Sequence, residues 1–216
     1  MEEFYKFFWL FVFGSFFGFL LETIWCMIRW RKIESRKGLI YGHLIPIYGL
    51  AGMFVVVIIE LLSIKKKHTI FLVTFFIGAI VEYFSSLFQE KVTGTISWDY
   101  SNMKYNLHGR INLVYLLGFG LFGIVWCSLY PKFLELLTIL FYNENIFKVI
   151  TYCMFVFIVY DLFISLVAMI RQKNRRKGWL PKNKFEIWLD NKFPDEYLKK
   201  IYANSMIVEE KAWGSI

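Results

Sequence analysis

Long apolar runs separated by short polar blocks dominate this chain of 216 residues. The runs cover about residues 4–28, 46–62, 70–88, 111–130 and 147–170. Each is close in length to the roughly 20 residues of helix that cross the hydrocarbon core of a bilayer. Because backbone N–H and C=O groups must be satisfied internally in lipid, the pattern predicts an all-α, polytopic membrane protein with about five transmembrane helices.

Composition supports this prediction and divides the chain in two. Hydrophobic residues make up 57% of the chain and charged residues 19%, and the charges fall in blocks between the runs. A soluble domain of this length would intersperse them over its surface. Residues 1–170 are therefore expected to form the transmembrane domain. Residues 171–216 are expected to form a basic cytoplasmic tail, a short helical appendage on the membrane surface.

The net charge of +8 comes mostly from Lys and Arg at the ends of the apolar runs. That placement follows the positive-inside bias and favours contact with the lipid bilayer over binding of nucleic acid. With five spans and the tail inside, thirteen positive charges lie on the inner side and six on the outer side. This predicts a multi-pass protein of the cell membrane with its N-terminus outside and its C-terminus inside.

Glycines and prolines mark three local features. Gly14 and Gly18 have the small-x-x-x-small spacing that lets a second helix approach closely. The glycine-rich residues 38–52, with Pro46, are expected to enter the second span irregularly. Pro131 is expected to end the fourth span, which leaves residues 132–145 as an interfacial helix or as an extension of that span.

Three acidic residues, Glu22, Glu82 and Asp161, interrupt the apolar runs. At a rise of about 1.5 Å per residue, all three lie roughly 9–14 Å in from the cytoplasmic face. A charge at the membrane centre costs at least ~2.5–3.5 kcal/mol, so each needs a partner. One interpretation is an ion-pair network that fixes helix packing. A site for a ligand, ion or proton is the interpretation we favour.

The polar residues 98–112 lie between the third and fourth runs and hold an acid, bases, a histidine, asparagines and aromatics. With the loop of residues 41–49, they are expected to wall a cytoplasm-facing pocket above the buried acids. Arg110 is the residue most expected to meet those acids or an anionic ligand. Asp99 is also an ordinary turn former. The candidate ligand-binding residues are Glu22, Arg36, Tyr41, Tyr48, Glu82, Glu90, Trp98, Asp99, Tyr100, Ser101, Asn106, Arg110, Asn112 and Asp161.

Several motifs do not occur in the sequence. It has no Gly-x4-Gly-Lys-Ser/Thr loop, so we expect no ATPase activity from this chain alone. Neither His-Glu-x-x-His nor Gly-x-Ser-x-Gly occurs, so no hydrolase is indicated and no catalytic residue is assigned. The acids with His43 and His108 match no established metal spacing, and we expect neither a metal nor a cofactor.

Several groups of residues together resemble a known family. They are Leu21-Glu-Thr-Ile-Trp-Cys26, Gly38-Leu-Ile-Tyr-Gly42, Pro46-Ile-Tyr-Gly49, Glu82-Tyr83, Glu90, Trp98-Asp-Tyr-Ser101, Asn106 and Gly109-Arg-Ile111. This pattern resembles the ABC-transporter type IV permeases, bacterial multi-pass membrane proteins common in Firmicutes, over about residues 4–131. The fifth run and the tail lie outside the resemblance.

The resemblance implies a transporter or an ABC-permease-like subunit, which is our first hypothesis. Such a subunit requires a separate ATPase for energy, and it is expected to form a homo-oligomer because five spans enclose few pathways alone. The second hypothesis is an intramembrane enzyme or lipid-headgroup-binding protein, in which Arg36 and Arg110 hold an anionic head group. The third is a membrane scaffold that recruits partners through its basic tail.

Overall fold

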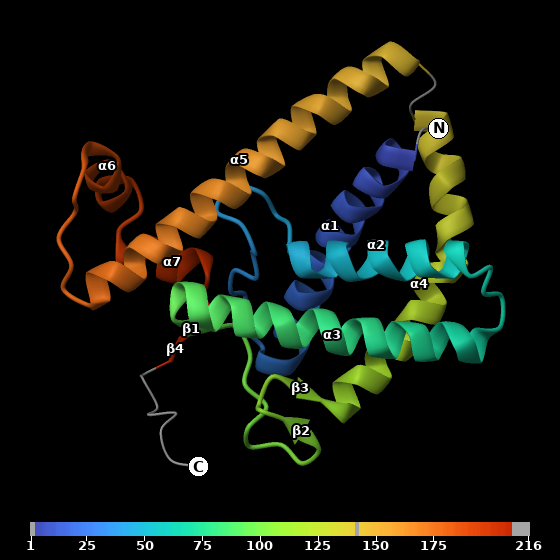
Figure 1. Cartoon of the computed structure of the whole chain (residues 1–216), viewed down its shortest axis with the longest axis horizontal. Coiled ribbons are helices and arrows are strands. Elements are labelled where there is room, and N and C mark those ends of the chain that lie inside the picture. Colours follow the sequence, from blue (N-terminus) through green and yellow to red (C-terminus); the bar gives the residue numbers. More distant parts are fainter. Residues whose placement is uncertain (1–2, 141–142, 209–216) are drawn as a thin grey trace.

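The computed structural model describes residues 3–140 and 143–208, which contain seven α-helices and four strands of two residues each (Figure 1). The helices are α1 (Glu3–Trp30), α2 (Pro46–Leu61), α3 (Lys67–Thr93), α4 (Leu113–Leu140), α5 (Glu144–Arg176), α6 (Lys184–Lys192) and α7 (Asp195–Ile201). The strands are β1 (Thr95–Ile96), β2 (Asn106–Leu107), β3 (Ile111–Asn112) and β4 (Met206–Ile207).

Within the described residues, four helices are long and apolar enough to cross a membrane, namely α1, α3, α4 and α5. This confirms the predicted class, a helical membrane protein. The second expected span, residues 46–62, corresponds to α2, a helix of 16 residues. At 1.5 Å per residue α2 is about 24 Å long, less than the roughly 30 Å of a bilayer core, so the count of five spans stays a prediction.

Contacts between helices show which helix ends lie together, and they define two opposite ends of the helical bundle. At one end, Lys6 of α1 lies 2.8 Å from Glu60 of α2, and Tyr130 of α4 donates to the same carboxylate at 2.6 Å. At the other end, Lys173 and Arg176 of α5 donate to backbone carbonyls in the last turn of α3. Figure 1 shows the N-terminal end of α1 beside the end of α4. Successive helices from α1 to α5, with the shorter α2 included, therefore run in alternating directions, as in a chain that crosses a membrane repeatedly.

The close approach predicted at Gly14 and Gly18 is present and involves α2. A Cβ at Gly14 would lie 3.1 Å from the Cα of Gly49, and one at Gly18 would lie 2.4 Å from the ring of Tyr48. Side chains at these positions would hold α1 and α2 apart. The start of α2 is thereby fixed against the middle of α1, which places Tyr48 beside Glu22 of α1.

The prediction that Pro131 ends the fourth helix is wrong. Pro131 lies inside α4, which continues to Leu140, so residues 132–140 extend this helix. Proline removes one backbone hydrogen bond, but helices in membranes tolerate the loss because packing against neighbours compensates. Residues 141–142 fall outside the described residues. The next helix begins at Glu144, after Asn143 accepts a hydrogen bond from the backbone of Ile146 at 3.2 Å.

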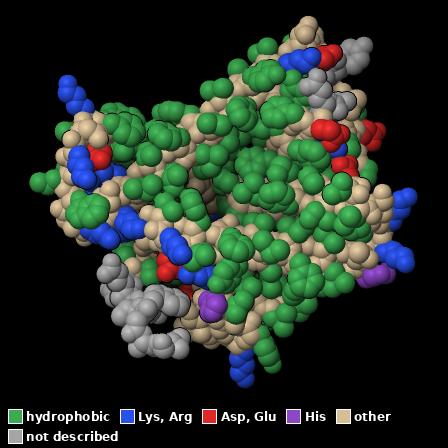
Figure 2. Space-filling model, in the orientation of Figure 1, with side chains coloured by type: hydrophobic (Ala, Val, Ile, Leu, Met, Phe, Trp, Pro, Cys, Tyr) green, Lys and Arg blue, Asp and Glu red, His purple; other side chains and the backbone are tan. Residues whose placement is uncertain are grey.

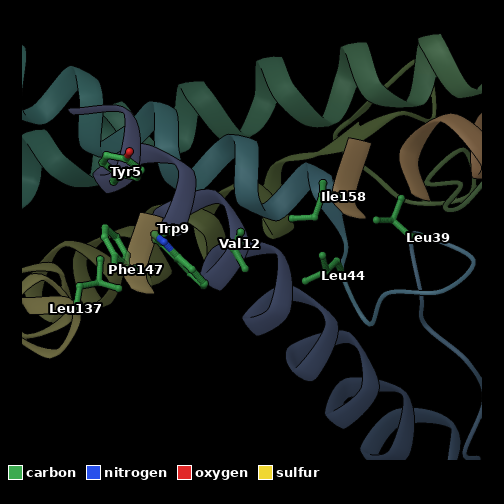
Figure 3. Close-up of a cluster of buried hydrophobic side chains, with 8 residues drawn as sticks. All are labelled: Tyr5, Trp9, Val12, Leu39, Leu44, Leu137, Phe147 and Ile158. Carbon is green, nitrogen blue, oxygen red and sulfur yellow. The ribbon is translucent and has the colours of Figure 1, made fainter. Parts of the chain in front are cut away.

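The main apolar core joins the N-terminal half of α1 to α4, α5 and the loop before α2 (Figure 3). Its buried members are Tyr5, Trp9, Val12, Leu39, Leu44, Leu137, Phe147 and Ile158. Trp9 also donates a buried hydrogen bond to Thr151 at 3.0 Å, which fixes α1 against α5. Elsewhere apolar side chains cover much of the helix surface, and Figure 2 shows charged side chains gathered mainly at the ends of the molecule.

The tail folds back onto the end of α5. Leu189, Phe193 and Leu198 from α6, α7 and their connection are buried against Ile164 and Ala168 of α5. Four charged side chains join the same elements: Arg171 and Arg175 of α5 both bond Asp190, and Arg175 also bonds Asp195. The tail contains two short helices, and β4 attaches them to β1 by antiparallel pairing. Its expected place on the cytoplasmic membrane surface stays a prediction.

Candidate functional site

One side of α3 carries the polar residues around which the candidate site is built. Glu82, Ser86 and Glu90 are spaced by four residues and therefore share a helix face. Glu82 and Ser86 are buried, with exposed fractions of 6% and 2%. Hydrogen bonds from the facing loop to all three side chains show that they share this face.

Arg110 fastens the loop of residues 97–112 to that face. Its guanidinium donates to Ser86 Oγ at 3.1 Å and to Glu90 Oε2 at 2.5 Å. The indole of Trp98 donates to the Arg110 carbonyl at 2.8 Å and so holds its backbone. The carboxylate that Arg110 bonds is therefore the partly exposed Glu90 at the end of α3, and not one of the three acids that it was expected to meet, Glu22, Glu82 and Asp161.

Tyr100 is the second contact between the loop and α3. Its hydroxyl donates to Glu82 Oε1 at 3.0 Å, and its ring stacks on Tyr115 with centroids 4.9 Å apart. Burial, together with the nearby Glu82 carboxylate, raises the pKa of the Tyr100 hydroxyl well above its usual value. Tyr100 therefore stays protonated and remains a hydrogen-bond donor to Glu82.

Two contacts of this loop were missed from the sequence. Tyr83 bonds His108 Nδ1 at 2.8 Å, and Tyr115 carries the stacked ring of Tyr100. Tyr83 directly follows Glu82 in the sequence. Its position beside a buried acid was a usable signal, whereas nothing in the sequence distinguishes Tyr115 from the other aromatics of an apolar run.

The remaining polar residues of the loop shape its own backbone. Asp99 accepts from the backbone and hydroxyl of Ser101, which is the turn-forming role considered for it. Asn106 bonds the backbone at Met103 and Gly109, and the fully buried Asn112 bonds the backbone at Lys104 and Val114. These side chains hold the β2–β3 hairpin, and their predicted contact with a ligand stays a prediction.

Glu22 joins the group through α2. Tyr48 donates to Glu22 Oε1 at 2.5 Å, and the Glu22 carboxyl lies close enough to interact electrostatically with both Glu82 and Tyr100. We refer to Glu22, Tyr48, Glu82 and Tyr100 as the acid–tyrosine cluster. It collects side chains from α1, α2, α3 and the 97–112 loop, so four separate segments of the chain meet at one polar point.

The cluster is short of positive charge. Glu82 Oε2 is buried and has no hydrogen-bond partner. Among the described residues, neither Glu22 nor Glu82 forms an ion pair with Lys, Arg or His. A buried carboxylate oxygen without a donor is costly, and the cost falls when a proton or a cationic group reaches it. The cluster is therefore chemically suited to receive a single positive charge.

Asp161 lies in a different setting from the other two intramembrane acids. It is fully buried and accepts from the backbone of Tyr41 at 3.1 Å, from Gly42 at 2.6 Å and from the Ser165 hydroxyl at 3.2 Å. Its hydrogen bonds thus hold the loop before α2. The side chain of Tyr41 stacks on Tyr160 of α5. The three acids expected to form one constellation therefore divide into a pair and a separate loop anchor.

Arg36 does not bond any of the acids. Its guanidinium donates to Cys26 Sγ at 3.1 Å, and its buried Nε has no hydrogen-bond partner. Arg36 is therefore held at the end of α1, and its contact with a ligand stays a prediction. Across residues 3–140 and 143–208, no three His, Cys, Asp or Glu side chains lie close enough together to hold a metal ion.

Two cavities lie between apolar helix faces. One of about 310 Å³ is an open hollow lined by α1, α5 and residues 42–44, and one of about 230 Å³ lies between α1 and α4. Their lining residues include none of the fourteen candidate site residues. A polar cavity open to the cytoplasm therefore stays a prediction.

Comparison with protein families gives a match to the family described as "Putative ABC-transporter type IV" over residues 9–166. Searches of curated proteins and of solved structures gave no significant match. The matched segment runs from α1 into α5 and contains the whole acid–tyrosine cluster. It extends past residue 131, so the view that the fifth apolar run lies outside the family pattern is wrong. The chain belongs to the ABC-transporter type IV family of membrane proteins.

Proposed function

We propose that this protein is the membrane-embedded subunit of a transporter of the cell membrane. In this proposal it crosses the bilayer five times, with its N-terminus outside and its tail inside. The family and the apolar helices support a transport component, and the acid–tyrosine cluster is the observation that carries the proposal. It places two carboxylates and two tyrosines from separate segments within the helical bundle.

The cluster suits a transporter because its members belong to elements that can move relative to one another. Tyr48 of α2 bonds Glu22 of α1, and Tyr100 of the loop bonds Glu82 of α3. A shift of one helix against the next would change how many donors each carboxylate has. Ionisable residues within membrane helices commonly mark the path of a substrate or an ion. Glu82, with its unbonded Oε2, is the residue proposed to contact the moving species.

Energy must then come from a separate ATPase subunit, since this chain has no phosphate-binding loop. The elements at the inner ends of the helices, namely the loop of residues 31–45 and the tail, are the surfaces proposed to meet it. Assembly of two or more copies is part of the proposal, because one copy offers few helices to surround a pathway.

A second candidate is a protein that handles lipids. The cavity of about 310 Å³ between α1 and α5 is lined by apolar side chains and has His43 beside it. An apolar cavity next to a polar loop is the arrangement that would take an acyl chain and its head group. The two candidates differ in what should change when Glu82 is neutralised.

The test combines affinity purification with a comparison of substrates. The tagged full-length protein is purified in mild detergent from its own cells, and copurifying proteins are identified and assayed for ATP hydrolysis. In parallel, metabolites and lipids are compared between cells carrying Glu82→Gln and cells carrying Glu144→Gln. Glu144 is a matched control because it is an acid at the exposed start of α5, paired only with Lys148 among the described residues.

Recovery of an ATPase and altered accumulation of a solute in Glu82→Gln cells alone is the expected result. Recovery of no nucleotide-binding subunit, with changed lipid turnover and unchanged solutes, would overturn the transporter in favour of the lipid-handling protein. If Glu82→Gln matches Glu144→Gln in every measured pool, the cluster has no part in transport.

A further inference from the structure

The two-helix appendage, α6 and α7, exposes large apolar side chains although it follows the long membrane helices in the sequence. Phe185, Ile187 and Trp188 of α6 and Tyr197 of α7 have exposed fractions of 43, 48, 40 and 38%. We call these four side chains the tail aromatic face. A water-facing appendage would rarely leave so many apolar side chains together unless another surface covers them.

Ring contacts connect this face to the lipid-exposed surface of α5. Trp188 stacks on Phe185 at 5.8 Å and meets Phe193 edge-on at 5.7 Å. Phe193 contacts Tyr41 at 6.4 Å, and Tyr41 stacks on Tyr160 of α5 at 6.2 Å. Tyr160 is 47% exposed on a helix long and apolar enough to cross a membrane. Through the buried ring of Phe193, the tail aromatic face is thus packed against side chains that reach the exposed, apolar surface of α5.

The position of the appendage along α5 fits the edge of the bilayer. Its buried residues Leu189 and Phe193 pack against Ile164 and Ala168. The helix α5 has 33 residues, about 50 Å at 1.5 Å per residue, whereas a hydrocarbon core needs roughly 20 residues. The last turns of α5 therefore project beyond the core, and the appendage returns from them to the level of the interface.

Charge on the appendage points to an anionic bilayer as the covering surface. Its exposed lysines are Lys182, Lys184, Lys192, Lys199 and Lys200. Asp190 and Asp195 are already bonded by Arg171 and Arg175, so the unneutralised charge on this part of the chain is mainly positive. Aromatic residues gather at the interface of membranes, and surface lysines are attracted by anionic head groups.

We propose that the appendage docks on the bilayer at the C-terminal end of α5, with the tail aromatic face among the lipid head groups and the lysines contacting anionic phospholipid. This proposal does not depend on the transport function. Docking would also affect α3, because the end of α5 and the appendage are attached to it. Lys173 and Arg176 of α5 donate to the last carbonyls of α3, and β4 pairs with β1, which follows α3. The lipid surface thereby restrains the end of the helix that carries Glu82 and Glu90.

The proposal is tested on the full-length protein in lipid nanodiscs. Cys26, Cys127 and Cys153 are replaced by alanine, and a fluorescent dye is attached after Trp188→Cys or, in the control, after Lys177→Cys. Residue 177 directly follows α5, thirteen positions beyond Ile164, so its dye lies about 20 Å farther out along the helix axis. Nitroxide-labelled lipid head groups then quench whichever dye they reach.

The expected result is several-fold stronger quenching at position 188 than at position 177, increased by phosphatidylglycerol in the disc. Charge reversal by Lys182→Glu with Lys184→Glu should reduce the quenching at position 188, and Lys65→Glu, at the opposite helix ends, should not. Equal and weak quenching at both positions would overturn the proposal. Quenching that ignores both phosphatidylglycerol and the charge reversals would overturn the role of anionic lipid.

A second measurement needs no substitution and covers the case of a variant that misfolds. The unmodified protein is illuminated in nanodiscs that contain a diazirine-bearing phosphatidylglycerol, and cross-linked peptides are mapped by mass spectrometry. Cross-links within residues 184–200 are expected. Cross-links confined to the long helices would overturn the proposal and leave the tail aromatic face to be covered by a protein.

Discussion

The guanidinium of Arg110 lies 2.5 Å from Oε2 of Glu90, and both side chains are withdrawn from solvent, with exposed fractions of 8% and 20%. This ion pair joins the end of the 97–112 loop to the C-terminal part of α3. Since Arg110 precedes β3 and α4 by only a few residues, the pair also fixes where the fourth helix begins relative to the third. Loss of this ion pair should therefore lower the free energy of unfolding and also change the geometry of the candidate site.

Replacing Arg110 with glutamine should destabilise the protein by about 2–3 kcal/mol, below the 3–5 kcal/mol of fully buried pairs because Glu90 is partly exposed. The loss arises mainly because Glu90 is left without a cation. Thermal unfolding in detergent measures it, with Lys104→Gln as a control on an exposed lysine of the same loop. Adding Glu90→Gln should restore most of the lost stability. If the Arg110→Gln protein unfolded at the same temperature as the Lys104→Gln control, the prediction would be contradicted.

Gly49→Ala should separate α1 from α2. A Cβ at Gly49 would lie 2.1 Å from Ser15 Oγ and 2.4 Å from the Phe11 carbonyl, and the backbone carbonyl cannot move aside. Overpacking of this kind typically costs about 1–3 kcal/mol or more. Gly118→Ala in α4 is the matched control, because nothing lies within 4 Å of its Cβ position. That control should unfold at the same temperature or higher, and a similar loss in both variants would refute the argument.

Asp161→Ala should release the loop before α2. The carboxylate accepts two backbone N–H groups, from Tyr41 and Gly42, and their loss leaves both donors unsatisfied. Trypsin should then cut at Lys37 several-fold faster than in the unmodified protein. Asp161→Asn retains one acceptor oxygen and should give an intermediate rate. Unchanged cleavage in Asp161→Ala would show that the loop is held by other contacts.

Acid should loosen the appendage through Asp190. Burial opposes ionisation of this carboxyl, but hydrogen bonds from Arg171 and Arg175 outweigh burial and lower its pKa below the usual 3.8. A lowered folded-state pKa means that the stabilisation is complete above about pH 4 and is lost as pH falls through the folded pKa. The fluorine resonances of fluorotryptophan at Trp179 and Trp188 report this change. Asp190→Asn should show the loosened resonances already at neutral pH, and an acid transition that persists in Asp190→Asn would exclude Asp190 as its cause.

Much of the fold was predictable because lipid imposes simple requirements on the chain. Apolar runs long enough to cross a bilayer gave the helical membrane class directly, and the spacing of Gly14 and Gly18 marked the contact with α2. The end of α4 was not predictable in the same way. Whether Pro131 stops a helix depends on the neighbouring helices that compensate for the missing hydrogen bond, and these neighbours are distant in the sequence.

The site was predictable where helix geometry alone decides it. A four-residue spacing places Glu82, Ser86 and Glu90 on one face, but it does not decide which of them Arg110 meets, and Arg110 bonds Ser86 and Glu90 while Glu82 is left to Tyr100. Asp161 shows the limit of that reasoning. Equal depth in the membrane does not fix the direction in which each helix turns its side chains, and Asp161 faces the backbone of a loop 119 residues away. Membrane depth alone therefore predicted one group of three acids, whereas the fold brings together only Glu22 and Glu82.

The hydrogen bond from Arg176 to the Thr93 carbonyl spans 83 positions of the chain, and it completes the last turn of α3. During synthesis at roughly 5–20 residues per second, the residues of that turn are made about 4–17 s before Arg176 is added to the chain. Over this interval the end of α3 carries carbonyl groups that its own helix cannot satisfy. The last turn of α3 is thus completed only when the end of α5 has been made. A chain stopped before residue 171 would lack Lys173 and Arg176, and the last carbonyl groups of α3 would keep no side-chain donor from α5.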